Sequence, residues 1–310
     1  MQIDIYYAVN FVITFPSMIS LGVLAAVGAL FGWGIADFLL QKLSRRHDTF
    51  RMMFCNSIIG LCITLPLAWS HLDTLPIITQ DLWLIGGICL GIFINVFFSI
   101  EALRSGKLAV ISPVFSLELP FTVLLTIFIA HELPTVLQAV LILVIFCGFF
   151  LLTFRGLPHD GKRYLVKLER GVLAALVGVV GLSFYNLTIG LASRLLHPAV
   201  TSFTISLFML ALSSIILLSR GQFRFPDVFE PLRHQPKLVL ATSLLYTGAG
   251  LCFAYATTML PISVATGISE GYVALSVLLG LTFNRERLKP VQIAGLMVVL
   301  GGIISLAFNS

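Results

Sequence analysis

The chain has 310 residues, of which 58% are apolar and 11% are charged, and its mean hydropathy is +1.02. A water-soluble domain of this size needs about a quarter of its residues charged to cover its surface. The composition therefore excludes a soluble fold and predicts that lipid covers most of the molecule. The formal net charge of +5 suggests a nucleic-acid partner, which the positions of the basic residues argue against below.

Ten apolar segments follow one another along the chain, and each is close to the roughly twenty residues that a helix needs to cross a bilayer. The first five are 21–40, 52–70, 82–100, 108–130 and 135–154. The second five are 171–193, 198–219, 238–260, 261–284 and 290–309. The segments are apolar at odd and even positions alike, whereas a transmembrane β-barrel strand alternates. We predict an all-α membrane protein with ten transmembrane helices.

The basic residues indicate how these helices are oriented. Of the 19 lysines and arginines, 18 lie in the odd-numbered connections and only Arg194 lies in an even-numbered one. Because cytoplasmic loops carry the excess of lysine and arginine, we expect the basic loops in the cytoplasm and both termini outside a plasma or inner membrane. The basic charge is then a topology signal, and no nucleic-acid partner is expected.

The N-terminal segment lacks a basic region before its apolar stretch, so we expect no cleavable signal peptide. Tyr6 and Tyr7 precede the first span and are typical of an interfacial anchor. Insertion should therefore depend on the first spanning helix itself.

Residues that would support catalysis or a cofactor are scattered along the chain. The five cysteines all lie inside apolar segments, and no pair has metal-ligand spacing. The pairs His71 with Asp73 and His159 with Asp160 lie in loops without a third ligand, and no glycine-rich phosphate loop is present. We therefore expect no enzymatic activity, no metal and no cofactor. A membrane-embedded enzyme, a receptor and a scramblase are the alternatives to a transporter.

The second half of the chain repeats the first at an offset of 154 residues. A three-point pattern near the end of each half recurs, in which Glu132, Gln138 and Gly148 match Glu286, Gln292 and Gly302. Because five spans per half is an odd number, the second copy enters the membrane inverted, a common plan of secondary transporters. We predict an N-terminal interfacial segment at 1–17, a first repeat at 18–156, a basic cytoplasmic linker at 157–170 and a second repeat at 171–310.

Several short motifs resemble the paired EamA-type domains of the drug/metabolite transporter superfamily. They are Gly32-Trp33-Gly34 in span one, the stretch from Ser112-Pro113 to Pro120 in span four, and the glutamates Glu132 and Glu286 before the last helix of each half. The resemblance covers about residues 18–309 and implies export or exchange of small organic solutes through a central cavity. The second half departs from the pattern, with Ala274 in place of Pro120 and no Gly-Trp-Gly in span six.

Ionised side chains are unfavourable inside a bilayer, by about 2.5–3.5 kcal/mol on insertion scales, so each needs an explanation. Glu118 and Glu270 lie near the middle of spans four and nine, whereas Asp37 and Glu101 lie near helix ends and are interpreted as interfacial. Thr266 and Glu270 share one helical face, whereas Glu118 has apolar neighbours, which favours Glu270 as the residue facing a wet cavity, with Glu118 as the alternative. Both glutamates are candidates for proton coupling.

Further polar and aromatic residues inside the spans are candidates for the wall of a substrate cavity. Together with Thr266 and Glu270 they are Trp33, Asn56, Asn95, Ser116, Tyr185, Asn186, Tyr246 and Tyr255. Aromatic rings with a few amides suit an amphipathic or zwitterionic organic solute. No lysine or arginine lies within a span, which argues against a sugar-phosphate carrier.

We therefore predict a secondary transporter, acting as an exporter of small organic metabolites such as amino acids by alternating access. A substrate gradient or protons would drive it, because no segment could form a nucleotide-binding domain. Lipophilic cations are the second substrate class to consider. The expected partners are the solute and the lipid bilayer, and no span carries a motif that predicts an oligomeric state.

Overall fold

A computed structural model describes residues 16–75, 82–105, 111, 114–153, 170–284 and 289–310. Every regular element within these ranges is a helix. Large apolar side chains such as Leu24, Phe128, Leu143 and Ile215 point outward and are more than half exposed. An apolar outer surface of this extent requires lipid around it. The all-helical fold and the membrane location are confirmed.

Within the described ranges, seven helices are long and apolar enough to cross a membrane. They are α2 (Pro16–Ser44), α3 (Thr49–Ala68), α5 (Leu82–Ser105), α9 (Arg170–Leu195), α10 (Pro198–Ser219), α13 (Pro236–Met259) and α16 (Pro290–Phe308). The apolar helix α8 (Val136–Thr153) is shorter, and η1 (Trp69–Thr74), α11 (Phe225–Val228) and α12 (Glu230–His234) are brief connecting elements. The count of ten spanning helices stays a prediction.

The predicted helices over 108–130 and 261–284 are not continuous, and this corrects the expectation from hydropathy. The first contains α7 (Glu118–Leu125), which continues into the wider turns of η2 (Thr126–Ala130). The second divides into α14 (Ile262–Ser269) and α15 (Gly271–Asn284). Hydropathy reports how apolar a segment is and carries no information on such breaks.

The two breaks lie at repeat-matched positions. Pro120 has no N–H to donate to the carbonyl of Ser116, which instead accepts from the N–H of Leu119 at 3.3 Å. In the second half the carbonyl of Glu270 accepts from the N–H of Val273 at 3.0 Å. Each break is thus a tight turn of the same kind, 154 residues apart.

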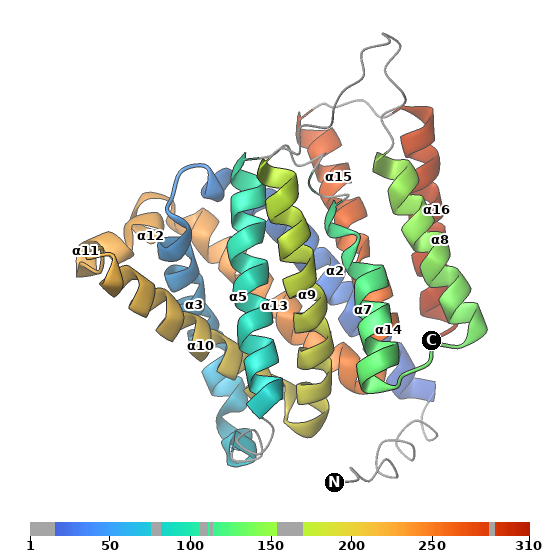
Figure 1. Cartoon of the computed structure of the whole chain (residues 1–310), viewed down its shortest axis with the longest axis horizontal. Helices are drawn as coiled ribbons and strands as arrows, with labels where there is room; N and C mark the ends of the chain where they lie inside the picture. The colour runs from blue at the N-terminus through green and yellow to red at the C-terminus, as the bar shows by residue number, and fades with distance from the viewer. Residues whose placement is uncertain (1–15, 76–81, 106–110, 112–113, 154–169, 285–288) are drawn as a thin grey trace.

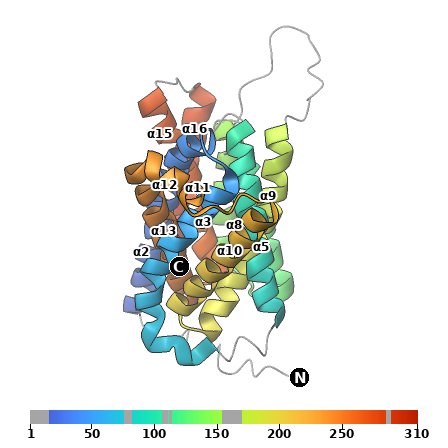
Figure 2. The same cartoon turned by 90° about the vertical axis from the view of Figure 1, so that its left-hand side faces the viewer.

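The helices also pair as an internal repeat requires. Helix α5 packs against α9, and their counterparts α13 and α2 pack against each other in the same way. Helix α3 packs against its own counterpart α10, and α8 against its own counterpart α16. The pair α3 and α10 faces the viewer in Figure 2, and the pair α8 and α16 lies at the right of Figure 1. These major contacts all join one half of the chain to the other.

The matched glutamines show why the three-point sequence pattern recurs. Gln138 at the start of α8 donates to the carbonyl of Asn309 at the end of α16, at 3.4 Å. Gln292 at the start of α16 donates to the carbonyl of Leu152 at the end of α8, at 3.1 Å. Each glutamine therefore joins the beginning of one helix to the end of the other, which makes α8 and α16 antiparallel.

The matched glycines allow these two helices to approach closely. A Cβ atom at Gly148 would lie 2.9 Å from the backbone nitrogen of Val299, and one at Gly302 would lie 2.7 Å from the side chain of Ile145. The matched glutamates cannot be compared in this way, because Glu286 lies outside the described residues. Tyr6, Tyr7, Ser112-Pro113 and residues 157–169 of the predicted linker also lie outside them.

Candidate functional site

A cavity of about 210 Å³ lies in the middle of the bundle, among α2, α3, α5, α9, α10 and α13. Glu118 at the start of α7 and Tyr272 at the start of α15 complete its wall, next to the two breaks. Its apolar wall includes Trp33, Met52, Met53 and Met209. Its polar wall includes Asp37, Asn56, Ser57, Asn95, Ser99, Tyr185, Ser202, Ser206, Thr242, Ser243, Tyr246 and Thr247.

The cavity extends toward one end of the bundle. Its wall comes from the C-terminal halves of α2 and α5, where Leu43 and Leu103 lie, and from the N-terminal halves of α3 and α13, where Met52 and Val239 lie. These helix ends gather at the upper end of the bundle in Figure 1. This is the end where the basic connections are attached.

The opposite end of the bundle is tightly packed. A Cβ atom at Gly22 of α2 would lie 2.9 Å from the Cβ of Met259 in α13, and one at Gly190 of α9 would lie 2.6 Å from Ile262. Real Cβ contacts are longer than this, so a side chain at either position would force its neighbour to move. The cavity is therefore closed toward this end.

Two buried carboxyl groups meet at the helix breaks. Glu118 is 3% exposed and its Oε1 accepts a hydrogen bond from the Asn186 amide of α9, while the neighbouring Glu270 is 1% exposed. Within the described residues, Glu118 Oε2 and both carboxyl oxygens of Glu270 lack a hydrogen bond of ordinary geometry. Buried polar atoms are almost always paired, so this cluster is a functional candidate.

A third carboxyl group, that of Asp37, accepts a hydrogen bond from the Tyr246 hydroxyl and lines the cavity. The sequence interpretation placed Asp37 at the membrane interface, one turn from the helix end. Helix α2 instead continues to Ser44, about two turns beyond Asp37. The extra length places this carboxyl group inside the bundle.

The predicted site residues divide into three groups. Trp33, Asn56, Asn95, Tyr185 and Tyr246 line the cavity. The second group lies behind the wall and is buried, and it comprises Ser116, Asn186, Thr266 and Glu270. Tyr255 lies elsewhere, with its ring 5.7 Å from that of His197 at the closed end. In this conformation Glu118 rather than Glu270 lines the cavity, and the roles of all these residues stay predictions.

Arg194 holds the closed end together. Its Nε donates to the carbonyl of Thr257 at 2.8 Å, its Nη2 donates to the carbonyl of Leu260 at 3.1 Å, and its Nη1 pairs with Glu132. The other Glu132 oxygen accepts from the backbone N–H of Ile262 at 2.9 Å. One ion pair therefore joins the end of α9 to the end of α13 and the start of α14.

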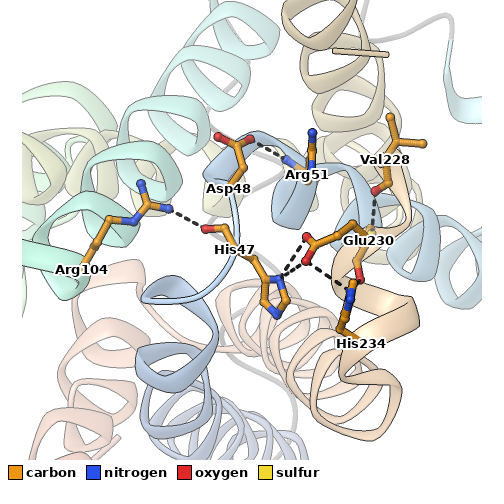
Figure 3. A network of polar contacts seen from close by, with 8 residues as sticks. His47, Asp48, Arg51, Arg104, Val228, Glu230 and His234 are labelled. Carbon is orange, nitrogen blue, oxygen red and sulfur yellow. Dashed lines mark hydrogen bonds and ion pairs between the residues drawn. The ribbon is translucent and has the colours of Figure 1, made fainter. Parts of the chain in front are cut away.

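Arg104 makes a similar set of contacts at the opposite end. It pairs with Glu101 at 2.6 Å and donates to the carbonyls of Ser44 and His47, both at 2.8 Å. Figure 3 shows how this network continues from His47 to Glu230 of α12, whose carboxylate lies 3.0 Å from His47 Nδ1. Arg104 thus joins the end of α5 to the end of α2, as Arg194 joins the end of α9 to α13.

A histidine pair adds to the closed end. The rings of His71 and His197 are stacked with their centroids 3.7 Å apart, and His197 Nδ1 accepts the N–H of Ala199 at the start of α10. Burial, and then the neighbouring His71, lower the pKa of His197 below its ordinary value. No group of three or more metal-binding side chains occurs within the described ranges.

Comparison with known proteins gives a family and a fold. No protein of established annotation matches the chain. A solved structure described only as "Crystal structure of protein" is 19% identical, with a TM-score of 0.69, over 93% of this chain and 96% of that chain. Such a likeness concerns the fold alone. The family model "EamA-like transporter family" matches twice, at residues 20–154 and 169–308. The chain therefore belongs to the EamA-like transporter family, with one copy of the family domain in each half.

Proposed function

We propose that the protein is a proton-coupled secondary transporter that exports small organic metabolites by alternating access. The observation that carries the proposal is a central cavity lined by the buried carboxyl group of Glu118, with that of Glu270 next to it, both incompletely paired and at repeat-matched helix breaks. Discontinuous helices near the middle of the membrane are where transporters bind substrates and coupling ions. Family membership supports transport, and the cavity and its carboxyl groups support the finer proposal.

The neighbouring carboxyl groups of Glu118 and Glu270 provide a reason for proton coupling. Two ionised carboxylates side by side in an apolar setting repel each other, and one shared proton relieves the repulsion. A solute that binds at Glu118 would compete for that proton, so the carrier would hold either solute or proton. Exchange of one for the other across the membrane is antiport.

The inverted repeat provides a reason for alternating access. Two halves with the same helix pairs can form two similar packings, each closed at a different end. In the present packing the Arg194 contacts close one end, and the cavity extends toward the other. We propose that the basic connections are cytoplasmic, so that solute enters the cavity from the cytoplasm and leaves at the Arg194 end.

Counterflow in proteoliposomes tests whether the protein is a carrier. Vesicles preloaded with an unlabelled panel of amino acids and organic amines should accumulate the same labelled solute transiently. The Glu118→Gln variant should lose solute-driven proton movement, whereas Asp73→Asn, an exposed change in η1, should behave as wild type. A receptor or an enzyme would bind or convert a solute without counterflow, and folded protein that gives no counterflow with any panel member contradicts the proposal.

A further inference from the structure

The charge of the cavity wall restricts which solutes it can hold. Asp37 and Glu118 line the cavity, Glu270 lies next to Glu118, and the charge of Asp37 is close enough to act on both glutamates. No lysine, arginine or histidine is among the described residues that line the cavity. The wall therefore supplies carboxyl groups with no cationic group to balance them, and when they ionise they favour a cationic occupant.

The hydrogen-bond partners of these carboxyl groups leave a position open for that occupant. Asp37 accepts from the Tyr246 hydroxyl and Glu118 accepts from the Asn186 amide, and both donors are neutral. Glu118 lines the cavity, and within the described residues its buried Oε2 has no donor other than a proton shared with the adjacent carboxyl group of Glu270. A charged donor such as an ammonium group forms the strongest hydrogen bonds to such oxygens.

Aromatic side chains line the same cavity, among them Trp33 and Tyr272. Trp33 lies one turn before Asp37 on α2, and its ring centroid is 6.2 Å from that of Tyr272 and 5.4 Å from that of Phe253. Tryptophan and tyrosine faces attract organic cations electrostatically. The combination of a carboxylate with these rings is typical of a site for an amine.

The remainder of the wall suits an apolar body. Met52, Met53 and Met209 line the cavity, and methionine side chains adapt their shape to apolar ligands. An engineered protein cavity of about 150 Å³ holds benzene. A volume of about 210 Å³ therefore has room for one aromatic ring with a short aminoalkyl chain.

We propose that the cavity binds a monocationic arylalkyl amine, with its ammonium group at Asp37 and Glu118 and its ring against Trp33 and the methionines. The proposal rests on the proposed function and names its substrate class. An amino acid fits less well, because its carboxylate would face Asp37 and Glu118 without a basic partner. The zwitterions expected first from the sequence therefore rank behind amines that lack a carboxylate.

Three compounds of one shape test the proposal by binding to the purified full-length protein in detergent, measured by calorimetry. They are 2-phenylethylamine, phenylalanine, which adds a carboxylate, and 2-phenylethanol, which lacks the charge. The amine should bind at least tenfold more tightly than either other compound, the difference expected for a hydrogen bond to a charged group. Equal or tighter binding of phenylalanine, or no binding of the amine to folded protein, would overturn the proposal.

Variants place the binding site. Asp37→Asn should weaken amine binding at least tenfold while leaving the weak binding of 2-phenylethanol unchanged, and Asp73→Asn should change neither. Unaltered amine binding in a folded Asp37→Asn variant overturns the site. Flux separates this proposal from the proposed function: amine that binds without counterflow contradicts the carrier alone, whereas counterflow of phenylalanine that ignores Asp37 contradicts the amine site alone.

Discussion

Replacing Arg194 by methionine should open the end of the bundle that is closed in this structure. Methionine keeps an apolar stem of similar length and removes the two hydrogen bonds to the carbonyls of Thr257 and Leu260, at 2.8 and 3.1 Å, and the ion pair with Glu132. The second Glu132 bond, to the N–H of Ile262, stays. The variant thus removes the contacts from α9 and leaves those of the neighbouring loop.

The size of the effect follows from the exposure of the ion pair. The Arg194 and Glu132 side chains are 33% and 19% exposed, so water replaces part of what is lost, and an exposed ion pair contributes about 0.2–1 kcal/mol. Hydrogen bonds from a charged donor are stronger, but those to the two carbonyls are also partly replaced by water. We expect a total of about 1–2 kcal/mol, which shifts the ratio of the two packings about 5- to 30-fold.

A buried thiol behind the contacts measures this shift. Ser263 of α14 is 0% exposed, so a Ser263→Cys variant should react with a membrane-impermeant thiol reagent only in the open packing. The background should lack the exposed cysteines Cys62 and Cys147. The labelling rate should rise about 5- to 30-fold in Arg194→Met.

Arg104 provides a matched control, because it binds two carbonyls and one carboxylate at the other end. Arg104→Met should leave the labelling rate at the Ser263→Cys position unchanged or lower it. If Arg194→Met has no effect, or if both arginine variants accelerate labelling equally, then Arg194 does not close this end and the reasoning is refuted.

Two further predictions concern packing and pH. Gly295→Ala should destabilise the fold by about 1–3 kcal/mol, because its Cβ would lie 2.4 Å from the backbone nitrogen of Leu152. Thermal unfolding in detergent measures this loss. The control Gly301→Ala, whose Cβ meets nothing within 4 Å, should unfold at the wild-type temperature. Acidification should weaken the closed end. The pKa of His197 is lowered below its ordinary 6.5, so the folded state favours the neutral ring that stacks on His71. The stabilisation from this stack is fully present above pH 6.5 and is lost as the pH falls through the lowered pKa of His197. The test uses the Ser263→Cys protein, with its labelling rate divided by that of an exposed thiol at the same pH to correct for the smaller thiolate fraction. This ratio should rise on acidification, and it should not rise when His197→Asn is added, which retains a side chain able to begin α10. Identical pH dependence with and without His197→Asn would contradict the role of the stack.

Hydropathy predicted the helical fold because lipid selects long apolar segments regardless of tertiary detail. The breaks could be predicted only in part. Pro120 signals the first, since proline lacks a donor, but Ala274 occupies the matching position of the second half, where the tight turn persists. Tertiary packing therefore maintains a turn that local sequence does not require.

The same breaks explain why the sequence favoured Glu270 over Glu118 as the cavity residue. Counting faces assumes one uninterrupted helix, and a tight turn changes the direction in which every later side chain points. Glu118 follows the turn at Ser116 and lines the cavity, whereas Glu270 lies within its own turn and behind the wall. Helical periodicity assumes a continuous helix and therefore cannot predict this change in side-chain direction.

The position of Asp37 was beyond sequence reasoning for a different reason. Its partner Tyr246 is 209 residues away in the other half, and no local pattern links them. The one available signal was the spacing of Trp33 and Asp37, which are four residues apart and share a face of α2. Only the packing of α2 against α13 shows that Asp37 faces Tyr246 and the cavity.

Solute-driven proton movement is the measurement that bears most directly on coupled transport. Proteoliposomes containing an internal pH indicator are challenged with 2-phenylethylamine or phenylalanine in the absence of an imposed gradient, with protein-free vesicles as the control for passive amine permeation. A carrier coupled at the paired carboxyl groups should move protons against the solute in wild type and Asp73→Asn, and in neither Glu118→Gln nor Glu270→Gln. Saturable solute flux that moves no protons, or proton movement that survives both glutamine variants, would contradict coupling at this site.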